Sequence, residues 1–431
     1  MTAPLLGSGT RAALDQLLSD REVAEVLHAL NGDGEETRIV GGAVRNALMG
    51  LPITEVDLAS TALPNEVTRR AARAGFKAVP TGIEHGTVTL VLRGRPFEVT
   101  TLREDIETDG RRAVVRFGRS FTADALRRDF TMNALSFDRQ GRVHDPVGGL
   151  ADLEARRVRF IGDAKTRIKE DFLRILRFFR FHASYATGSL DADGLAAAIS
   201  LREGLRLLSA ERIRNELFKL IRAPGAAATA EQMLAGGFWP LILGGVPHVS
   251  RFKSAVGAQA SFPEMAEAMA RLAALAVRTK EDAMRLRQRL RLSNVEATSL
   301  TAIASVLEGL HGALSQGGHG QAKWEVARLV LDHGAKSVRI ALATEGPGPG
   351  SNRIAELSRF ADATPSFPLS GADLLKRGIP AGPEVGRLLA LVREDWIRQG
   401  CPLEKSALSS ILDRAREQKT GRMTGPPSTA I

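Results

Sequence analysis

The pattern of apolar residues changes near residue 150, and this change limits what the 431-residue chain can fold into. Before it, short runs rich in β-branched residues alternate with turn residues. Gly86–Leu92 and Pro96–Thr101, joined at residues 93–95, predict a hairpin. After it, strand patterns nearly vanish and apolar residues recur at helical spacing, most clearly over Ile168–Ala183. The sequence therefore predicts an α+β fold: an N-terminal head with a mixed β-sheet, followed by an all-helical remainder.

Further elements are predicted within the first 150 residues. Strands are expected at Thr37–Val40, Ala113–Phe117 and Ala134–Phe137, and helices at Arg11–Leu30, Gly42–Met49 and Asn65–Ala74.

Composition excludes several classes of protein. The single cysteine, Cys401, rules out an intramolecular disulfide framework and a cysteine-based zinc cluster. We find no apolar signal core and no run of the ~18–20 apolar residues that a membrane span needs, so a reducing cytoplasm without membrane contact is expected. The net charge of +10 favours an anionic partner such as nucleic acid, although an arginine-rich composition also follows from a GC-rich genome.

A glycine pair provides the first candidate site. In the segment Arg38–Ser60, a predicted strand runs into Gly41 and Gly42, which open a helix. Glycines let backbone N–H groups approach a phosphate, and Arg45, one turn later, can clamp the same phosphates. The spacing fits neither GxGxxG nor a P-loop, and an ordinary tight strand–helix turn remains the alternative.

Two carboxylates follow at a spacing of two residues. If Glu55 and Asp57 lie on a strand, their side chains point to the same face. Paired carboxylates beside a phosphate site suit a hard divalent ion such as Mg²⁺, which activates a hydroxyl and stabilises a leaving pyrophosphate. Glu98 supplies a third ligand if its strand lies alongside. A solvated surface pair is the alternative.

The head ends with RRDFTMNAL (127–135), where Arg128 can pair with phosphate and Asp129 can accept a hydrogen bond from a ribose hydroxyl. At this point the residues resemble a known family. The motifs GGAVRN, EVDLAS, TGIEHGT, FEVTTLRED, RRDFTMNAL, KEDFLRILRFFRF and SAERIRNEL occur in order from about Arg38 to Leu220. Together they resemble the class II tRNA nucleotidyltransferases (CCA-adding enzymes) and the related bacterial poly(A) polymerases of the DNA polymerase beta superfamily.

The resemblance implies an architecture and a chemistry. It implies a catalytic nucleotidyltransferase head over residues 1–150, a helical neck with a nucleotide-selecting motif over 151–224, and a tRNA-binding body and tail over 225–431. The implied reaction is Mg²⁺-dependent nucleotidyl transfer. The resemblance assigns the metal to Glu55 and Asp57, the third acidic position to Glu98, the triphosphate to Gly41, Gly42 and Arg45, and the ribose to Asp129.

Two positions depart from the family pattern. The family usually has Asp where this chain has Glu55, and the extra methylene displaces a bound metal by about 1 Å, which octahedral Mg²⁺ tolerates poorly. Asn46 replaces another Asp, which removes a charge but keeps hydrogen bonding.

Asp171 and Arg174 match the family's EDxxR motif, and the pattern places them three residues apart on one helix. A carboxylate accepts from the exocyclic amine of cytosine or adenine, and a guanidinium donates to the neighbouring ring nitrogen. Guanine and uracil present the opposite pattern, so one Asp–Arg pair selects C and A. Arg177, one turn on, is expected to reach phosphate. An exposed ion pair is the alternative.

Three functions compete. The leading interpretation is a tRNA nucleotidyltransferase that adds or repairs the 3′-terminal CCA from CTP and ATP. The second is an A-only enzyme, and the third is a decayed RNA-binding scaffold, favoured only by Glu55. The stretch Glu104–Ser120 is predicted to be a flexible loop, which in the family accompanies A addition. No protein partner can be inferred.

Overall fold

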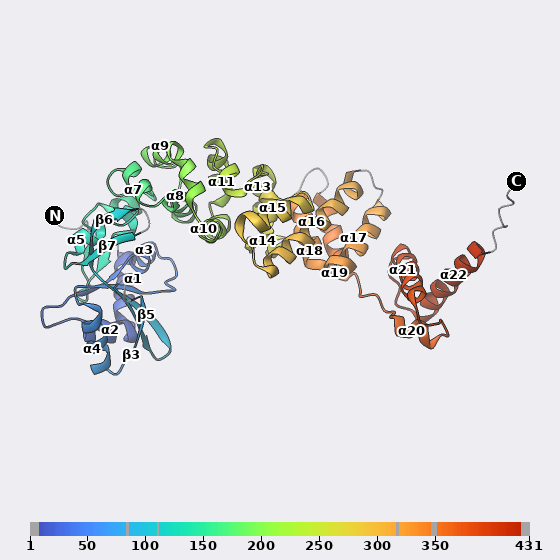
Figure 1. Cartoon of the computed structure of the whole chain (residues 1–431), viewed down its shortest axis with the longest axis horizontal. Helices are drawn as coiled ribbons and strands as arrows, with labels where there is room; N and C mark the ends of the chain where they lie inside the picture. The colour runs from blue at the N-terminus through green and yellow to red at the C-terminus, as the bar shows by residue number, and fades with distance from the viewer. Residues whose placement is uncertain (1–7, 83–85, 110–111, 316–318, 346–350, 424–431) are drawn as a thin grey trace. The chain divides into compact units, whose positions relative to one another are not determined.

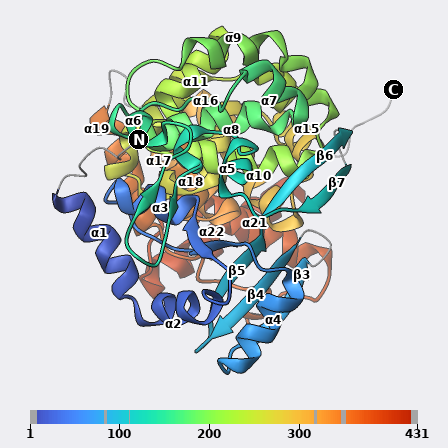
Figure 2. The same cartoon turned by 90° about the vertical axis from the view of Figure 1, so that its left-hand side faces the viewer.

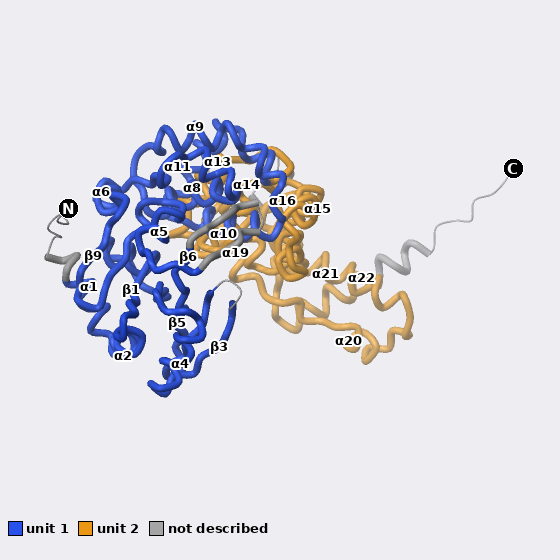
Figure 3. The backbone as a smooth tube through the Cα atoms, turned by 60° about the vertical axis from the view of Figure 1, so that its left-hand side comes forward, with its two compact units in different colours: residues 1–242 blue, residues 243–431 orange. Residues whose placement is uncertain are grey.

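The computed structural model describes residues 8–82, 86–109, 112–315, 319–345 and 351–423 (Figure 1). The chain divides into two compact units, residues 1–242 and 243–431 (Figure 3). Unit 1 contains a sheet and helices, and unit 2 is helical in its described residues, so the predicted α+β class is confirmed. The finer division into head, neck, body and tail stays a prediction.

A mixed seven-stranded sheet forms the scaffold of unit 1. Its strand order is β3-β4-β5-β2-β1-β8-β9, and β2 runs parallel to β5 while the other neighbours are antiparallel. The strands are β1 Thr37–Val40, β2 Asp57–Ser60, β3 Lys77–Gly82, β4 Thr87–Leu92, β5 Arg95–Thr101, β8 Ser136–Phe137 and β9 Val143–His144.

The predicted hairpin is confirmed as β4 and β5 (Figure 2). Its turn residues Arg93 and Gly94 have φ angles of 49° and 88°, and two positive φ angles are typical of the tight turn whose twist matches that of the strands. Burial alternates along β4, so one face of this strand packs against the interior.

The predicted loop over Glu104–Ser120 is wrong for most of its length. Arg103–Asp109 (β6) and Arg112–Phe117 (β7) pair as an antiparallel sheet of two strands, separate from the main sheet (Figure 2). The strand predicted at Ala113–Phe117 is confirmed. β-Branched residues such as Val114 and Val115 favour strand pairing, which the loop prediction overlooked.

Two long predicted helices are each divided in two. The helix predicted at Arg11–Leu30 is α1 Ser8–Ser19 and α2 Arg21–Leu30, because the carboxylate of Asp20 accepts hydrogen bonds from the N–H groups of Glu22 and Val23 and starts a new helix. The helix predicted over Ile168–Ala183 is divided near Asp171, as described below with the site.

The other helices of unit 1 lie between the strands in sequence and after the last strand. They are α3 Gly42–Leu48, α4 Pro64–Arg73, α5 Phe121–Leu126, α6 Gly149–Glu154, α7 Ala164–Glu170, α8 Leu173–Tyr185, α9 Ala192–Ser200, α10 Ala210–Arg222, α11 Ala226–Ala235 and α12 Trp239–Leu243, with short 3₁₀ turns at Thr131–Asn133 and Arg202–Leu207.

Aromatic packing joins the end of the sheet region to α8. The Phe130 ring lies 4.9 Å from that of Phe160 and 5.1 Å from that of Phe181, and Phe160 stacks on Phe178 at 5.3 Å between centroids. Because Phe130 is fully buried and adjoins Asp129, this cluster fixes the RRDFT segment against the helix that follows the EDxxR motif.

Unit 2 is built from helices that pack on one another. They are α13 Val249–Gly257, α14 Ala268–Ala276, α15 Lys280–Leu290, α16 Asn294–Ser315, α17 His319–His333, α18 Ala335–Glu345, α19 Ser351–Ala363, α20 Gly371–Lys376, α21 Pro383–Arg398 and α22 Lys405–Met423, with 3₁₀ turns at Ala258–Ala260 and Pro263–Ala266. Among the described residues, none of these helices combines the length and the apolar character of a membrane span.

Candidate active site

One polar pocket in unit 1 brings together residues that are far apart in the sequence. Its volume is 630 Å³, and it is lined by ten of the eleven predicted site residues. These are Gly41, Gly42, Arg45, Glu55, Asp57, Arg128, Asp129, Asp171, Arg174 and Arg177. The eleventh, Glu98, lines a pocket of 220 Å³ that shares Asp57 and Arg128 with the larger one.

The glycine pair lies against two arginines. Gly41 has φ 67° and ψ −124°, a conformation that a side chain would strain, and a Cβ there would lie 3.3 Å from Nη1 of Arg128. A Cβ on Gly42 would lie 3.6 Å from Nη2 of Arg45. The amide of Gly41 already donates to the carbonyl of Leu135, so this amide is not free for a phosphate.

Arg45 is buried and bonded to the protein on every side. Its guanidinium donates to Asn133 Oδ1 at 2.7 Å, to Asn46 Oδ1 at 2.9 Å and to the hydroxyl of Tyr185 at 2.8 Å. Burial lowers the pKa of Arg45. The predicted contact with phosphate stays a prediction; the geometry shows that Arg45 also ties α3 to α8.

Asn46 keeps the hydrogen-bonding role expected of it. Its Oδ1 accepts from Arg45, and its Nδ2 donates to the carbonyl of Pro52 at 2.8 Å. The residue therefore fastens the segment that leads to the carboxylates onto α3.

Glu55 and Asp57 share one face, but not on one strand. The prediction of a strand is wrong for Glu55, because β2 begins at Asp57. The intervening Val56 is buried while both carboxylates are exposed, so the segment is extended and alternates as a strand does. Asp57 and Glu98 occupy directly neighbouring positions of the parallel strands β2 and β5, which confirms the expectation that the strand of Glu98 lies alongside.

These acidic residues repel one another. Desolvation in the concave site, and then the charges of Glu98 and Glu55, raise the pKa of Asp57, against the opposing effect of Arg128. Within the described part of the chain, no group of three or more His, Cys, Asp or Glu side chains converges as a metal site would. Two carboxylates and substrate phosphates are nevertheless a common way to hold Mg²⁺, and carboxylate oxygen is the donor this ion prefers.

Arg128 is held in place by a buried carboxylate. Asp124 accepts from Nε of Arg128 at 3.1 Å and from Nη2 at 3.0 Å, and Arg127 pairs with the same carboxylate. Burial opposes ionisation of Asp124, but the two arginines outweigh it and lower its pKa. Both guanidiniums thus line the pocket in fixed positions.

Asp129 and Arg177 pair with each other. The Asp129 side chain is 7% exposed and accepts from Arg177 Nε at 2.7 Å, from Asn133 Nδ2 at 3.0 Å and from the amide of Phe130 at 2.9 Å. Burial acts to raise the pKa of Asp129, but Arg177 and Asn133 outweigh the effect of burial, so the pKa is lowered. The roles predicted for ribose and phosphate stay predictions, and a ligand would have to share these partners.

The EDxxR motif lies at a break between helices. The predicted single helix is wrong here: α7 ends at Glu170, Asp171 is extended with φ −157°, and α8 begins at Leu173. Asp171 Oδ1 accepts from the amide of Leu173 at 3.0 Å, so this carboxylate competes with the helix and starts the next one. Asp171 and Arg174 are therefore not neighbours on one helix face.

Each member of the motif has another partner. Arg212 Nη2 donates to Asp171 Oδ2 at 2.7 Å, and Arg174 pairs with Glu170 at 2.5 Å. Arg212 comes from the SAERIRNEL motif, which lies at the start of α10. Both Asp171 and Arg174 nevertheless line the pocket.

The sequence prediction missed other residues of the pocket, among them Asn133, Arg180 and Phe181. Arg180 continues the three-residue spacing of Arg174 and Arg177, and this spacing could have identified it. Asn133 and the buried Glu216, which pairs with Arg180 and Arg177, carry no comparable local signal. His85 of the TGIEHGT motif lies outside the described residues.

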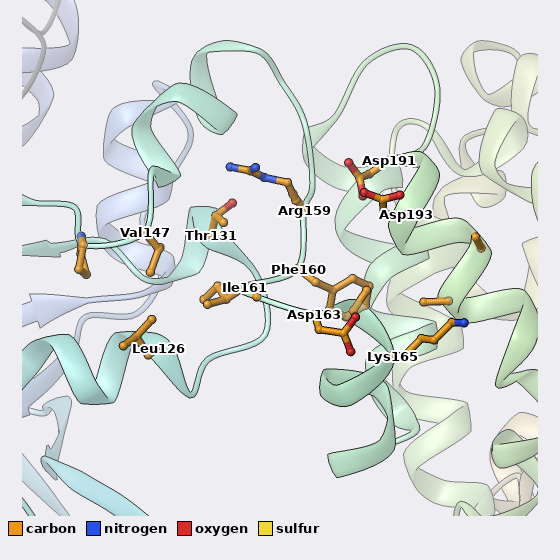
Figure 4. A pocket seen from close by; sticks show the side chains of 15 residues that line it. Leu126, Thr131, Val147, Arg159, Phe160, Ile161, Asp163, Lys165, Asp191 and Asp193 are labelled. Carbon is orange, nitrogen blue, oxygen red and sulfur yellow. The ribbon is translucent and has the colours of Figure 1, made fainter.

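A second pocket of unit 1, of 760 Å³, contains none of the predicted site residues (Figure 4). Arg159, Asp191 and Asp193 lie along it, and Phe160 and Ile161 supply apolar surface. Arg159 is bonded to the buried carboxylate of Asp152. The pocket of 630 Å³ is the candidate active site, because it combines carboxylates with arginines.

Comparison with known proteins gives consistent results. The model of the Poly A polymerase head domain matches residues 37–159. The mitochondrial CCA tRNA nucleotidyltransferase 1 of Mus musculus is 32% identical over 386 residues, 89% of this chain and 87% of the relative. The CCA-adding enzyme of Levilactobacillus brevis is 40% identical over 229 residues, which cover 52% of this chain and 56% of that enzyme.

Solved structures share the fold along most of the chain. The crystal structure of the Bacillus stearothermophilus CCA-adding enzyme in complex with CTP has a TM-score of 0.71 at 27% identity, covering 95% of this chain and 99% of that one. The Thermotoga maritima CCA-adding enzyme complexed with tRNA has a TM-score of 0.72 at 18% identity. The match covers 93% of this chain and 98% of that chain. With a relative more than 30% identical across nearly its whole length, this chain belongs to the CCA tRNA nucleotidyltransferase family.

Proposed function

We propose that this protein adds or repairs the 3′-terminal CCA of tRNA from CTP and ATP and releases pyrophosphate. The observation that carries the proposal is the register of β2 and β5, which sets Asp57 beside Glu98 at the edge of a pocket lined by seven arginines. A carboxylate edge next to fixed guanidiniums suits a reaction that joins a hydroxyl to a triphosphate.

The carboxylates fit a divalent cation, and we propose that Glu55 and Asp57 hold Mg²⁺. When bound, the ion supplies Lewis acidity to the phosphate oxygens. The raised pKa of Asp57 supports a cation site, because the repulsion among Asp57, Glu98 and Glu55 is relieved by positive charge.

The arginines orient the triphosphate. Arg128 is fixed by Asp124, and Arg177 is fixed by Asp129, so both present guanidiniums without reorganisation on binding. The 3′-oxygen of the tRNA then forms a bond to the α-phosphorus in line with the breaking bond to the bridging oxygen. Pyrophosphate leaves with the electron pair of the broken bond, and the hydroxyl proton passes from the attacking oxygen to water.

Asp171 and Arg174 are proposed to select the base. A carboxylate has about four lone-pair positions, and the Asp171 side chain uses two, for Leu173 and Arg212. It can therefore still accept from the exocyclic amine of C or A. Arg174 can donate to the ring nitrogen while Glu170 holds its other side. An incorrect base would leave these groups unpaired, which is costly in a desolvated pocket.

Several further assignments belong to the proposal. The Bacillus stearothermophilus structure with CTP and the Thermotoga maritima structure with tRNA support these substrate classes. We propose the head over residues 1–150, the neck over 151–224 and the tRNA-binding body and tail over 225–431. We also propose a cytoplasmic location, because Cys401 is a free buried thiol. Three of the relatives, by contrast, are named mitochondrial.

The test uses three tRNA transcripts that end before CCA, after C and after CC. Each is incubated with the protein and Mg²⁺ plus CTP, ATP or both, and products are sized at single-nucleotide resolution. Growth of all three to CCA and no further supports the proposal. Extension of only the CC-ended tRNA with ATP would show an A-adding enzyme. The addition of long A tails would show a poly(A) polymerase. Binding of tRNA without incorporation would indicate a decayed scaffold.

A further inference from the structure

We propose that Asn46 and Tyr185 are positioning residues that hold Arg45 in the active-site pocket as a cation with no carboxylate partner, so that its charge is available to the triphosphate. The contact between Arg45 and the triphosphate belongs to the proposed function, on which this inference rests. What goes beyond it is the role of the two neutral side chains, and their hydrogen bonds to Arg45 are the observation that carries it.

Seven arginines line the active-site pocket, and six of them form ion pairs with carboxylates of the protein. The pairs are Arg127 and Arg128 with Asp124, Arg174 with Glu170, Arg177 with Asp129, Arg180 with Glu216, and Arg212 with Asp171. Arg45 differs from them: among the described residues, its guanidinium donates only to neutral side chains. The pocket therefore contains one cation that no carboxylate balances at close range.

The hydrogen bonds of Arg45 fix its guanidinium and leave one donor. Nε and Nη2 donate to Asn46 Oδ1 at 3.2 and 2.9 Å, Nη1 donates to Asn133 Oδ1 at 2.7 Å, and Nη2 donates to the Tyr185 hydroxyl at 2.8 Å. A guanidinium has five N–H groups, so these four bonds leave one on Nη1. Because Arg45 is 6% exposed and lines the pocket, a ligand in the pocket is the acceptor that this group can reach.

Tyr185, the single tyrosine of the chain, contacts Arg45 in two ways. Its hydroxyl accepts the hydrogen bond from Nη2, and the centroid of its ring lies 4.1 Å from Cζ of Arg45. The ring of Phe181, one turn earlier on α8, lies 5.3 Å from the same atom. Aromatic rings attract a cation through their quadrupole and add no negative charge. Tyr185 therefore orients Arg45 without neutralising it.

The surroundings of Arg45 favour a bound anion. Burial is the largest cause that lowers the pKa of Arg45, and the charges of Arg180 and Arg177 act in the same direction, against the opposing charge of Asp129. An arginine stays charged in a protein despite such effects. A phosphate group in the pocket would reverse the unfavourable balance, because it supplies the negative charge that the neutral partners of Arg45 do not.

Asn46 decides whether Arg45 has a counter-charge. This is a position where the chain departs from the family pattern, and its side chain bonds on both ends: Oδ1 accepts from Arg45, and Nδ2 donates to the carbonyl of Pro52 at 2.8 Å. A carboxylate at position 46 could accept the same bonds from Arg45, but it would add a negative charge next to the guanidinium and lose the bond to Pro52. Asn46→Asp is therefore a change of charge with little change of shape.

The test measures the Kd of CTP for the full chain by isothermal titration at fixed Mg²⁺ without tRNA. Tyr185→Phe, which removes the hydroxyl and keeps the ring, should raise this Kd about fivefold. Asn46→Asp should raise it about tenfold, because the new carboxylate competes with phosphate for Arg45. During CCA addition, the KM for CTP should rise by similar factors with kcat within about twofold, since Arg45 holds the triphosphate in the ground and transition states alike.

Two control variants match these changes outside the pocket. Thr344→Val in unit 2 removes a buried hydroxyl that donates to the carbonyl of Ile340 at 2.7 Å. Asn31→Asp in unit 1 adds a carboxylate where the amide oxygen now accepts from the amide of Thr37 at 3.0 Å. Both controls should leave the Kd of CTP within about 1.5-fold of wild type, because additive effects of distant sites do not reach the ligand.

A double-mutant cycle separates positioning from a general structural role. In an Arg45→Lys background, Tyr185→Phe should change the Kd of CTP by less than about 1.5-fold, because the guanidinium that the hydroxyl holds is gone. The wild-type protein gives a further readout: labelling with 3-fluorotyrosine produces one fluorine resonance, from Tyr185. This resonance should shift when CTP binds, and Arg45→Lys should reduce the shift.

The outcomes separate this inference from the proposed function. An unchanged Kd in either variant would overturn the role of that residue. A fivefold effect of Tyr185→Phe that persists in the Arg45→Lys background would show that the hydroxyl does not act through Arg45. CCA addition by the wild-type protein would still stand in both cases. If the protein binds CTP in a way that depends on Asn46 and Tyr185 but adds no nucleotide to tRNA, the proposed reaction fails and the positioning of Arg45 remains.

Discussion

The carboxylates on the two sides of the active-site pocket have opposite surroundings. On the sheet side, Asp57 lies beside Glu98 and Glu55, and their repulsion with desolvation raises its pKa. On the helical side, Asp129 is bonded to Arg177 and its pKa is lowered. The first side is electrostatically incomplete without a cation, while the second is complete within the protein. The difference supports the proposal that a cation binds on the sheet side, whereas a nucleotide on the helical side would share partners that the protein already bonds.

The largest expected effect comes from removing the charge on the sheet side. Asp57→Asn should lower kcat by about 10³-fold, because metal stabilisation of the transition-state charge is worth several kcal/mol. Single-turnover incorporation of CTP into a tRNA ending before CCA measures this. Thr54→Ala, at a neighbouring exposed position, serves as the control. Full activity of Asp57→Asn would remove the sheet side from the mechanism.

On the helical side we expect a loss of stability as well as activity. Asp129→Ala should lower the free energy of unfolding by about 3 kcal/mol, because it leaves the partly buried Arg177 with only the longer contact to Glu216 at 3.6 Å. Urea denaturation measures the change. Asp57→Asn should leave the free energy of unfolding within about 1 kcal/mol of wild type, because Asp57 is exposed. Equal destabilisation of both variants would contradict the contrast between the two sides.

The pH dependence should also differ between the two sides. Because the folded pKa of Asp57 is raised, its contribution to stability without metal is present at low pH and is lost as pH rises through that pKa. Asp129 has a lowered pKa, so its contribution is present above the unfolded pKa and is lost as pH falls through the folded one.

Mg²⁺ binding needs ionised Asp57, so metal affinity should fall as pH drops through the raised pKa of this residue. Isothermal titration with Mg²⁺ at several pH values tests this, with Asp57→Asn as the reference that lacks the titrating group. A metal affinity that is independent of pH in the wild-type protein would show that Asp57 is not a ligand.

The smallest effect is expected from Glu55→Asp, which restores the residue usual in the family. Glu55 lies in an extended segment before β2 rather than inside the strand ladder, so the backbone can accommodate the longer side chain. We expect kcat to change less than about threefold, which corresponds to under about 1 kcal/mol. A tenfold increase would show that Glu55 misplaces the metal.

The sequence predicted which residues come together better than it predicted the elements that carry them. Ten predicted residues line one pocket, because Gly41, Asp57 and Asp171 belong to local patterns that chemistry restricts. The helix breaks at Asp20 and Asp171 were missed, since a carboxylate that caps the next helix does not interrupt the apolar spacing. Asn133 and Glu216 were missed because their contacts with Arg45 and Arg180 join residues more than thirty positions apart.

The sequence by itself determined the α+β division near residue 150, the hairpin of β4 and β5, and the types of residue that the chemistry requires. These follow from short-range periodicity and turn preferences, which a few neighbouring residues specify. Only the tertiary structure decided that Glu98 lies beside Asp57, that Arg212 holds Asp171, and that Arg45 faces Asn133 and Tyr185. Such pairs depend on strand order and helix packing, which burial of the whole apolar surface selects and no local pattern encodes.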